Sequence, residues 1–524
     1  MRRIRRILVW TAIAVIGVAA IAVAGVGGLI WATLPRGDLD AAIPGLTAPV
    51  DVTIDADGIP RIRAQNRLDA AAALGFLHAR ERLFQMDLMR RAAAGDLSEI
   101  TGPAALGIDR MMRTLGVRAS AEADLAALSP DVRAVLDAYA RGVNAWIDRR
   151  GRFSAEEFAV LGTPPPWRPI DSLLWGKTMA LYLSGNWRAE LARLNLSARL
   201  PQPVIDALWP SSAGGGGHPE AALLPDPVRA MKLADLLPTF PDPFTLPAEE
   251  SNEWAVDGKH AATGAPLLAG DPHLGFGFPA IWYLARIDTP QGVLAGATAP
   301  GVPFLVLGHN GKIAWTFTTT GSDTEDLFVE TPEGSDRYMT PDGPRPFQVR
   351  QERIRVRGRP DELWTVRATR HGPLISDLTN RGGPLLALSI ASLMPGDAAA
   401  AGLMALNEAA DITAAGAAAA RITSPNQNLL VADRNGIGLF VTGRVPVRRA
   451  GDGSFPAPGA SGDYDWVGWA AGDQLPHFVD PPSGRLVNAN ERIAPPDFPV
   501  FLSRDWFGDE RARRIRAMLD AQST

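Results

Sequence analysis

Hydrophobic positions recur at three- and four-residue spacing between Asp69 and about Trp146, as in LDAAAALGFLHARERLFQMDLMRR, and this spacing predicts amphipathic helices. One of these helices is expected to begin at Ser129-Pro130, because Ser is a good N-cap and Pro fits the first helical position. The next segment, IDSLLWGKTMALYLSGNWRAELARLNLSARL, is largely apolar and is predicted to be half buried. The first part of the chain is therefore expected to be rich in helices.

Strand-like patterns flank this helical part. Before it, VDVTIDADGIPRIRA alternates apolar and polar residues around an Asp-Gly turn, which predicts a β-hairpin. After Ser251, short β-type runs are bounded by Gly, Asp and Asn, among them NEWAVDG, PLLAGDP, IWYLARIDT, FLVLGHNGKIAWTFTTT, ERIRVRG and NLLVADRNGIGLFVTG. Helices upstream and strands downstream indicate an α+β fold with layered sheets.

A segment of different composition separates the two parts. Residues 210–250 are rich in proline and contain the run Gly214 to Gly217, which is typical of a linker or an excised spacer. The predicted organisation is therefore a helix-rich region at 37–209, a linker at 210–250 and a strand-rich region at 251–524.

The N-terminus predicts a membrane segment at residues 1–36. Arg2, Arg3, Arg5 and Arg6 precede an uncharged, mostly apolar run from Ile7 to Leu34, which exceeds the roughly 20 residues that span a bilayer. The arginines favour a cytoplasmic N-terminus, so this transmembrane helix would place the body outside the cytoplasm. A cleaved signal peptide, with a small-residue site at Ala22-Val23-Ala24, is the alternative. Both place the body in a bacterial periplasm or its equivalent.

Composition narrows the chemistry. The chain has 524 residues, 46% hydrophobic and 21% charged, which is ordinary globular composition. The net charge of −5 and the lack of a Lys/Arg stripe argue against nucleic-acid binding. Because the chain has no Cys, a catalytic nucleophile must be Ser, Thr, Lys or a carboxylate.

Ser251 opens the strand-rich region directly after the linker, in EESNEWAVDG. A free α-amine titrates near pH 8 and could serve as general base for the hydroxyl of the same residue. That hydroxyl could first attack the carbonyl of Glu250 and cut the chain, which would create the amine. The alternative is that Ser251 is an ordinary cap or turn residue.

Several blocks, in order, resemble the penicillin acylase (penicillin amidase) family of N-terminal-nucleophile hydrolases. Upstream of the linker they are GFLHARERLFQMDLMRR and WGKTMALYLSGNWRAEL; downstream they are SNEWAVDGKHAATGAPLLAGDPHL, GHNGKIAWTFTTTGSDTEDLFVE, SPNQNLLVADRNGIGLFVTGRVPVR and NANERIAPPDFPVFLSRDW. The resemblance runs from about residue 48 to about 518. It implies a four-layer α/β/β/α sandwich, with autocatalytic cleavage at Glu250–Ser251 that yields an α/β heterodimer. It also implies an acylase for N-acyl substrates such as β-lactam antibiotics or N-acyl homoserine lactones.

The resemblance assigns catalytic roles residue by residue. Ser251 matches the nucleophile, and the main chain of Thr319 and the side chain of Asn428 match the oxyanion hole. Arg448 matches an arginine that orients Asn428 and the amine. His273 matches a histidine of the cephalosporin and homoserine-lactone acylase branches, where it would relay a proton or hold the amine. Taken alone, an Asn in a turn, a surface Arg and a loop His are the ordinary alternatives.

The resemblance further implies a structural Ca²⁺ and an apolar acyl pocket. The calcium ligands match Glu190, Asp323, Asp326 and the carbonyl of Glu325, which offer the hard oxygens that Ca²⁺ prefers. Solvated acidic loops are the alternative. The substrate pocket would include five apolar residues that could equally fill a core: Met179, Leu183, Leu274, Val306 and Leu307.

Two features depart from the family pattern. Glu250 precedes the nucleophile where the family often has Gly, and the sequence stops at Thr524 where family members usually continue. The C-terminal part of the usual fold is therefore expected to be missing, with exposed edges for a partner chain or self-association to cover. Three interpretations follow. The chain is a membrane-anchored acylase, a truncated inactive relative, or, if the resemblance is set aside, an extracytoplasmic binding protein.

Overall fold

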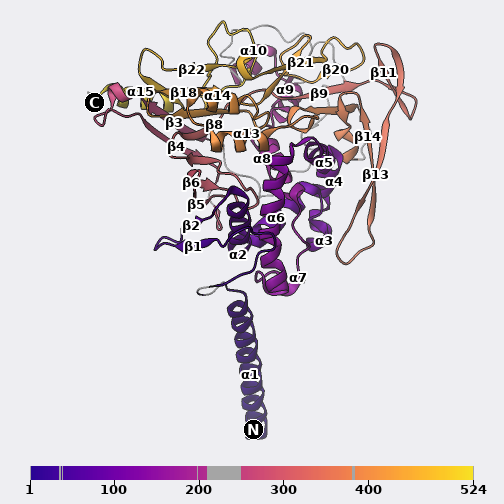
Figure 1. The fold of residues 1–524 in the computed structure, drawn as a ribbon. Helices are drawn as coiled ribbons and strands as arrows, with labels where there is room; N and C mark the ends of the chain where they lie inside the picture. The colour runs from indigo at the N-terminus through magenta and orange to yellow at the C-terminus, as the bar shows by residue number, and fades with distance from the viewer. Residues whose placement is uncertain are drawn as a thin grey trace.

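The N-terminal apolar run forms one helix, α1 (Arg2–Thr33), which stands apart from the folded body (Figure 1). It is the one helix among the described residues that is long and apolar enough to cross a membrane, and its most apolar stretch is 0% buried. A signal sequence has the same properties, so the helix is compatible with either an anchor or a signal peptide.

The computed structural model describes residues 2–34, 37, 39–197, 199–208, 250–275, 277–379 and 384–522. The predicted linker at 210–250 lies outside the described residues except for Glu250.

Helices fill most of the region before the linker, as the spacing of apolar residues predicts. The helix expected at Ser129-Pro130 is α6 (Pro130–Arg150), with Ser129 as its N-cap residue. The largely apolar segment after it forms two helices, because Ser184 ends the first of them. The other helices of the body are α2 (Arg67–Ala94), α3 (Ser98–Thr101), α4 (Leu106–Leu115), α5 (Val117–Ala127), α7 (Phe158–Leu161), α8 (Pro169–Leu183), α9 (Trp187–Ser197), α10 (Gln202–Leu208), α13 (Ala399–Glu408), α14 (Ile412–Ala419) and α15 (Glu510–Asp520).

Two sheets carry the candidate site. The three-stranded sheet has the order β23 (Arg485–Asn488), β3 (Glu250–Val256), β4 (Leu267–His273). The nine-stranded sheet has the order β1 (Asp51–Ile54), β2 (Pro60–Arg63), β5 (Tyr283–Thr289), β6 (Gly292–Thr298), β7 (Leu307–His309), β8 (Ala314–Thr319), β17 (Gln427–Ala432), β18 (Ile437–Val441), β22 (His477–Val479).

Shorter sheets complete the strand-rich region. They comprise β16 (Leu385–Ile390) with β9 (Glu325–Glu330) and β20 (Ala457–Pro458); β19 (Arg444–Arg448) with β21 (Trp466–Ala471); β13 (Gln348–Ile354) with β14 (Glu362–Thr369) and β15 (Gly372–Pro373); and β10 (Pro332–Glu333) with β11 (Arg337–Thr340) and β12 (Gly343–Pro346).

The hairpin expected near residues 50–64 is present as β1 and β2, which pair antiparallel. β2 then pairs in parallel with β5, so that Arg61 lies opposite Arg286 across the ladder. The part of the chain before the linker therefore supplies two strands to a sheet whose other strands follow Ser251. The two parts share one structure rather than forming separate domains.

Helices and sheets stack in layers. The two sheets face each other across an apolar layer made of Ala255, Leu430, Ala432, Ile437, Leu439 and Leu486. On its outer face the nine-stranded sheet packs against α2 and α14, while α15 packs against β3 and β23. The mixed helix and sheet content confirms the predicted fold class at that level, and it brings β3 next to β8 and β17.

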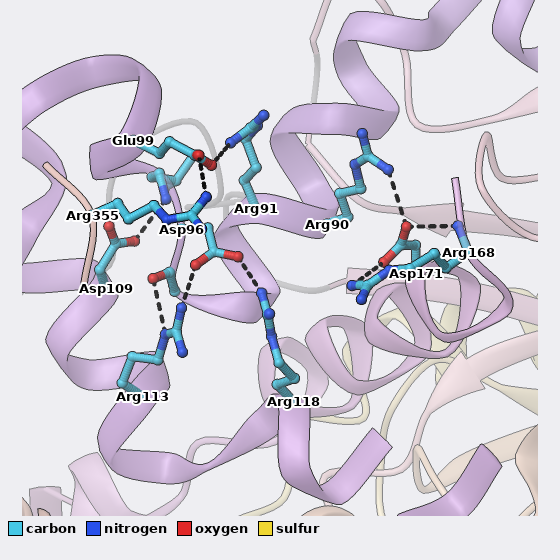
Figure 2. Close-up of polar contacts among 12 residues, drawn as sticks. Arg90, Arg91, Asp96, Glu99, Asp109, Arg113, Arg118, Arg168, Asp171 and Arg355 are labelled. Atoms are coloured by element: carbon cyan, nitrogen blue, oxygen red, sulfur yellow. Dashed lines mark hydrogen bonds and ion pairs between the residues drawn. The ribbon is translucent and has the colours of Figure 1, made fainter. Parts of the chain in front are cut away.

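An ion-pair network joins the helical region to a strand that follows the linker (Figure 2). Arg91 and Arg355 both pair with Glu99, at 2.6 Å and 3.1 Å. Nearby, Arg113 and Arg118 both pair with Asp96. Because Arg355 directly follows β13, this network crosses from one part of the chain to the other. Partly exposed pairs contribute only about 0–1 kcal/mol each, so they orient the contact more than they stabilise it.

Candidate active site

Ser251 lies in β3 at the edge of the layer between the two sheets, and only 4% of it is exposed. Its backbone N–H donates to Asn490 Oδ1 at 2.6 Å. Its Oγ accepts from the backbone N–H of His273 at 3.3 Å, across the ladder with β4. Both reactive atoms of this residue, the nitrogen and the hydroxyl oxygen, are therefore held by neighbouring groups while the chain is uncut.

Asn490 connects Ser251 to the end of β8. Its Oδ1 accepts from Ser251, and its Nδ2 donates to the carbonyl oxygen of Thr319 at 2.9 Å. Asn490 is fully buried and has a φ of 70°, a left-handed conformation that Asn tolerates better than most residues. The Asn490 amide thus lies between Ser251, the predicted nucleophile, and Thr319, whose main chain is predicted to belong to the oxyanion hole.

Arg511, from α15, fixes this arrangement from the other side. Its guanidinium donates to the carbonyl of Ser251 at 2.7 Å, to Asn252 Oδ1 at 2.9 Å and to Asn490 Oδ1 at 3.1 Å. It also lies 3.8 Å from the carboxylate of Glu250. One arginine therefore touches the residues on both sides of the predicted cleavage bond.

Asn428 and Arg448 are not the side chains that hold Ser251. Asn428 lies on β17, opposite Thr318 of β8. Its Nδ2 donates to Thr318 Oγ1 at 3.0 Å and to Asn488 Oδ1 at 2.9 Å. Arg448 binds Asp323 and Asp326 instead. Asn490 and Arg511 make the contacts with Ser251 that the resemblance implied for Asn428 and Arg448.

A buried carboxyl, Glu253, lies two residues after Ser251 on β3. Glu253 accepts from Thr318 Oγ1 at 3.2 Å, and Thr318 also donates to Asn488 at 2.8 Å. Burial raises the pKa of Glu253 well above its ordinary value, which favours the neutral form of this carboxyl.

His273 touches Ser251 through its backbone rather than its ring. The ring Nε2 lies 2.7 Å from Asp271 Oδ2, and both side chains are about half exposed, at 50% and 59%. Asn252 donates to the same carboxylate oxygen at 3.0 Å. The predicted proton relay through the imidazole stays a prediction.

A cavity of ≈ 120 Å³ opens beside Ser251 and is lined by Ser251 and Thr319 together with mostly apolar side chains. All five residues of the predicted pocket line it: Met179, Leu183, Leu274, Val306 and Leu307. Trp175, Phe304 and Phe317 extend the apolar wall. The buried charges Lys177, Asp124 and Asp397 line it as well, and Lys177 lies 2.6 Å and 2.9 Å from the two carboxylates.

The predicted calcium ligands gather around Arg448. Asp323 and Asp326 each accept from its guanidinium at 2.7 Å, and Glu190 Oε2 accepts from the backbone N–H of Leu327 at 3.1 Å. Burial and the nearby Asp326 and Asp323 raise the pKa of Glu190 well above its ordinary value. The carbonyl of Glu325, which is the predicted ligand, accepts from Asn186 Nδ2 at 2.5 Å. The carboxylate of Glu325 accepts from Ser184 at 2.7 Å, and burial raises its pKa to about 7.

As placed, these donors do not fit a calcium ion. Among the described residues, no group of three or more His, Cys, Asp or Glu side chains is arranged to hold a metal. The carboxylate oxygens that would bind the ion accept hydrogen bonds from Arg448 instead. Calcium binding stays a prediction, and no catalytic step depends on it.

The residues that sequence reasoning missed carried a weak signal. Asn490 stands in Asn-Ala-Asn directly after β23, and a second Asn after a buried strand is compatible with a left-handed turn. Arg511 stands among several arginines of an exposed helix, so nothing in its local sequence separates it from surface charges.

The family match covers nearly all of the chain that follows α1. Residues 49–524 match the family model described as penicillin amidase. The acyl-homoserine lactone acylase QuiP of Pseudomonas aeruginosa is 33% identical over 92% of this chain and 59% of its own length. The penicillin acylase 2 proenzyme of Pseudomonas sp. strain SE83 is 34% identical over 94% of this chain and 65% of its own length. The chain thus spans about three fifths of the length of these relatives.

Among solved structures, penicillin G acylase of Alcaligenes faecalis aligns with a TM-score of 0.45 and 24% identity over 52% of this chain and 49% of that one.

Proposed function

Because the chain belongs to the penicillin amidase family, we propose that it is an acylase, an amidohydrolase that acts on linear amides and matures by cutting itself at Glu250–Ser251. The observation that carries the proposal is the position of Ser251. Its nitrogen and its hydroxyl oxygen are both fixed by hydrogen bonds, and the residue opens onto an apolar cavity.

Maturation comes first in the proposed sequence. Ser251 Oγ attacks the carbonyl carbon of Glu250, the C–N bond breaks, and the resulting ester is hydrolysed by water. Ser251 then carries a free α-amine, and the α and β parts remain together as a heterodimer. Arg511 donates to the carbonyl of Ser251 and so restricts the movement of the residue that follows the Glu250–Ser251 bond.

Amide hydrolysis follows from the same atoms. The α-amine takes the proton of Oγ, directly or through a water, as Oγ attacks the substrate carbonyl. That proton passes to the leaving amine, and water then releases the acyl group from the ester. Asn490 Oδ1 holds the amine, and Asn490 Nδ2 with the main-chain N–H of Thr319 stabilises the oxyanion.

The substrate is proposed from the cavity and the relatives together. The wall that Met179, Leu183, Leu274, Val306 and Leu307 form favours an apolar acyl group. The names of the relatives point to N-acyl homoserine lactones and β-lactams with an acylated amine. His273 and its partner Asp271 lie on β4, the strand next to Ser251, and His273 would influence proton transfer there.

The cellular location is proposed from α1. Four arginines precede its apolar stretch, so α1 is proposed to anchor the protein in the membrane with the body in the periplasm. Sequencing the N-terminus of the α part from a membrane fraction tests this: the native start supports an anchor, and a start near Val23 to Gly25 supports a cleaved signal peptide.

A panel of N-acyl substrates tests the activity. The purified protein is incubated with acyl homoserine lactones of increasing chain length, with acylated β-lactams and with simple amides, and products are detected by mass spectrometry. Release of the free amine and the free acid by the wild type, and by no Ser251→Ala sample, supports the acylase. Binding of these compounds without any release would favour a binding protein or an inactive relative.

A further inference from the structure

Three buried carboxylates surround a single arginine near the candidate site. Glu190 comes from α9, Asp323 from the loop after β8 and Asp326 from β9, and at most 4% of each residue is exposed. Arg448, at the end of β19, reaches into this group with 5% of its side chain exposed. These four residues are called the carboxylate cluster below.

Arg448 engages the two aspartates with one edge of its guanidinium, through Nε and Nη2. Its Nε donates to Asp326 Oδ2 at 2.7 Å, and its Nη2 donates to Asp326 Oδ1 at 2.9 Å and to Asp323 Oδ1 at 2.7 Å. Such a two-pronged contact with one carboxylate matches the planar fork that Arg presents and Lys does not. The geometry is that of a fixed internal ion pair.

Two of these aspartate oxygens accept a second hydrogen bond. Trp466 Nε1 donates to Asp326 Oδ2, and Asn186 Nδ2 donates to Asp323 Oδ1 at 2.7 Å. A Ca²⁺ ion takes six to eight oxygen ligands, and N–H donors directed at the same oxygens compete with it.

The backbone at Gly453 packs against the carboxylate cluster. A Cβ added at Gly453 would lie 2.6 Å from Asp326 Oδ1, 2.7 Å from Asp323 Oδ2 and 2.8 Å from Arg448 Nη2. Gly453 also has a φ of +70°, so glycine is needed there on both grounds. The main chain therefore lies directly against the carboxylates, where an ion and its water ligands would otherwise be placed.

The neighbouring acidic residues have cations of their own. Asp505 pairs with Arg193, and Asp452 pairs with Arg504 at 2.7 Å. Arg448 therefore pairs with Asp323 and Asp326 rather than with these outer aspartates.

We propose that Arg448 is the resident cation of the carboxylate cluster and takes the place of a structural Ca²⁺ ion in this chain. The guanidinium supplies the positive charge that buried carboxylates require, and it does so without any ion from the medium.

The Arg448 ion pairs would affect the C-terminal end of β8, where Thr319 lies. Asp323 follows Thr319 by four residues, and Asp326 lies at the start of β9, so Arg448 ties the β9 end of the loop between β8 and β9 to β19. The loop that positions Thr319 would keep its place when calcium is withdrawn. This inference concerns structure and stability, and it does not depend on the proposed acylase activity.

The test compares calcium content and thermal stability. Wild-type protein is dialysed against metal-free buffer, its calcium is measured by mass spectrometry, and its Tm is recorded with EGTA and with millimolar Ca²⁺. The expected result is no bound calcium and the same Tm in both buffers. About one Ca²⁺ per chain after dialysis, or a Tm that falls in EGTA, would overturn the proposal even if no variant folds.

Variants locate the effect. Arg448→Met leaves the carboxylates unpaired, so its Tm should fall by several degrees and be partly restored by Ca²⁺, which can then bind the freed oxygens. Arg448→Lys keeps the charge, so its Tm should fall less.

Arg444→Met is the control, because Arg444 is a buried arginine of the same strand that donates to the carbonyls of Ala391, Met394 and Pro395. Its Tm should fall without any response to Ca²⁺; an equal response in both Met variants, or none in Arg448→Met, would contradict the assignment.

Discussion

Asn490 makes the two hydrogen bonds that link Ser251 to Thr319, and its truncation should affect the transition state more than substrate binding. Asn490→Ala is expected to lower kcat by roughly 10²–10³ because one oxyanion donor is lost, with KM little changed. The measurement is steady-state kinetics on fully matured protein.

Asn428→Ala is the matched control, since Asn428 is also a fully buried asparagine but bonds to Thr318 and Asn488. It should lower stability and leave kcat closer to that of the wild type. The larger loss of kcat in Asn428→Ala would return the oxyanion role to that residue.

Arg511 is expected to matter for maturation. Arg511→Met removes the donors to the carbonyl of Ser251 and to Asn490, so the cut at Glu250–Ser251 should be slower and uncut chain should accumulate. A time course on denaturing gels measures the uncut fraction. Arg513→Met is the control on the same helix, because Arg513 is exposed and pairs only with Asp509 in the described part of the chain. Equal maturation of both variants would remove Arg511 from this role.

At this scale the change of composition before Ser251 drew attention to that residue, and the family resemblance named five apolar residues that do line the cavity. The resemblance also implied that Asn428 and Arg448 lie at Ser251, whereas Asn490 and Arg511 make the contacts with it. The reason is directional: alternate residues of a strand face opposite sides, so only the three-dimensional register shows that Asn428 points between the sheets. No local pattern distinguishes a buried arginine contact from a surface one.

Among the elements, the turn between β14 and β15 holds a buried histidine. His371 lies 2.7 Å from Glu330 and 2.9 Å from Asp465. Burial alone would lower the pKa of His371, but the hydrogen bonds to Asp465 and Glu330 outweigh it and the pKa is raised above 6.5. Burial would raise the pKa of Asp465, yet its hydrogen bonds to His371 and Arg370 lower it from 3.8 to about 2.

These shifts predict a pH window for stability. A raised histidine pKa stabilises the fold below pH 6.5, and this contribution is lost as the pH rises through the folded-state pKa. A lowered aspartate pKa stabilises it above pH 3.8, and this contribution is lost as the pH falls toward 2. The difference in Tm between wild type and His371→Asn should therefore be largest between about pH 4 and 6.5 and should shrink at alkaline pH. A difference that grows from pH 6.5 to 9 would contradict the charged state of His371.

Local periodicity predicted the elements better than their partners. The start of α6 and the β1–β2 hairpin follow from neighbouring residues. The parallel pairing of β2 with β5 joins residues more than two hundred positions apart, and it depends on which edge the folded sheet leaves open. The same limit applies to the cluster around Arg448, whose members come from separate elements.

For the whole molecule, the shared sheet predicts that cleavage leaves the protein in one piece. β1 and β2 precede the cut, and β2 pairs with β5, which follows it, while α2 and α6 share a buried apolar core with β5 and β8. Size-exclusion chromatography of matured protein should therefore give one species that contains both parts, and only denaturant should separate them. Elution of the two parts apart under native conditions would contradict the shared core.

The position of the cut is the most direct test of the central claim, that Ser251 is an N-terminal nucleophile. The purified C-terminal part is subjected to N-terminal sequencing, alongside the Ser251→Ala variant on a denaturing gel. The expected sequence is Ser-Asn-Glu-Trp, with Ser251→Ala as one uncut chain. Any other start, or an uncut wild-type chain that is properly folded, would contradict the account.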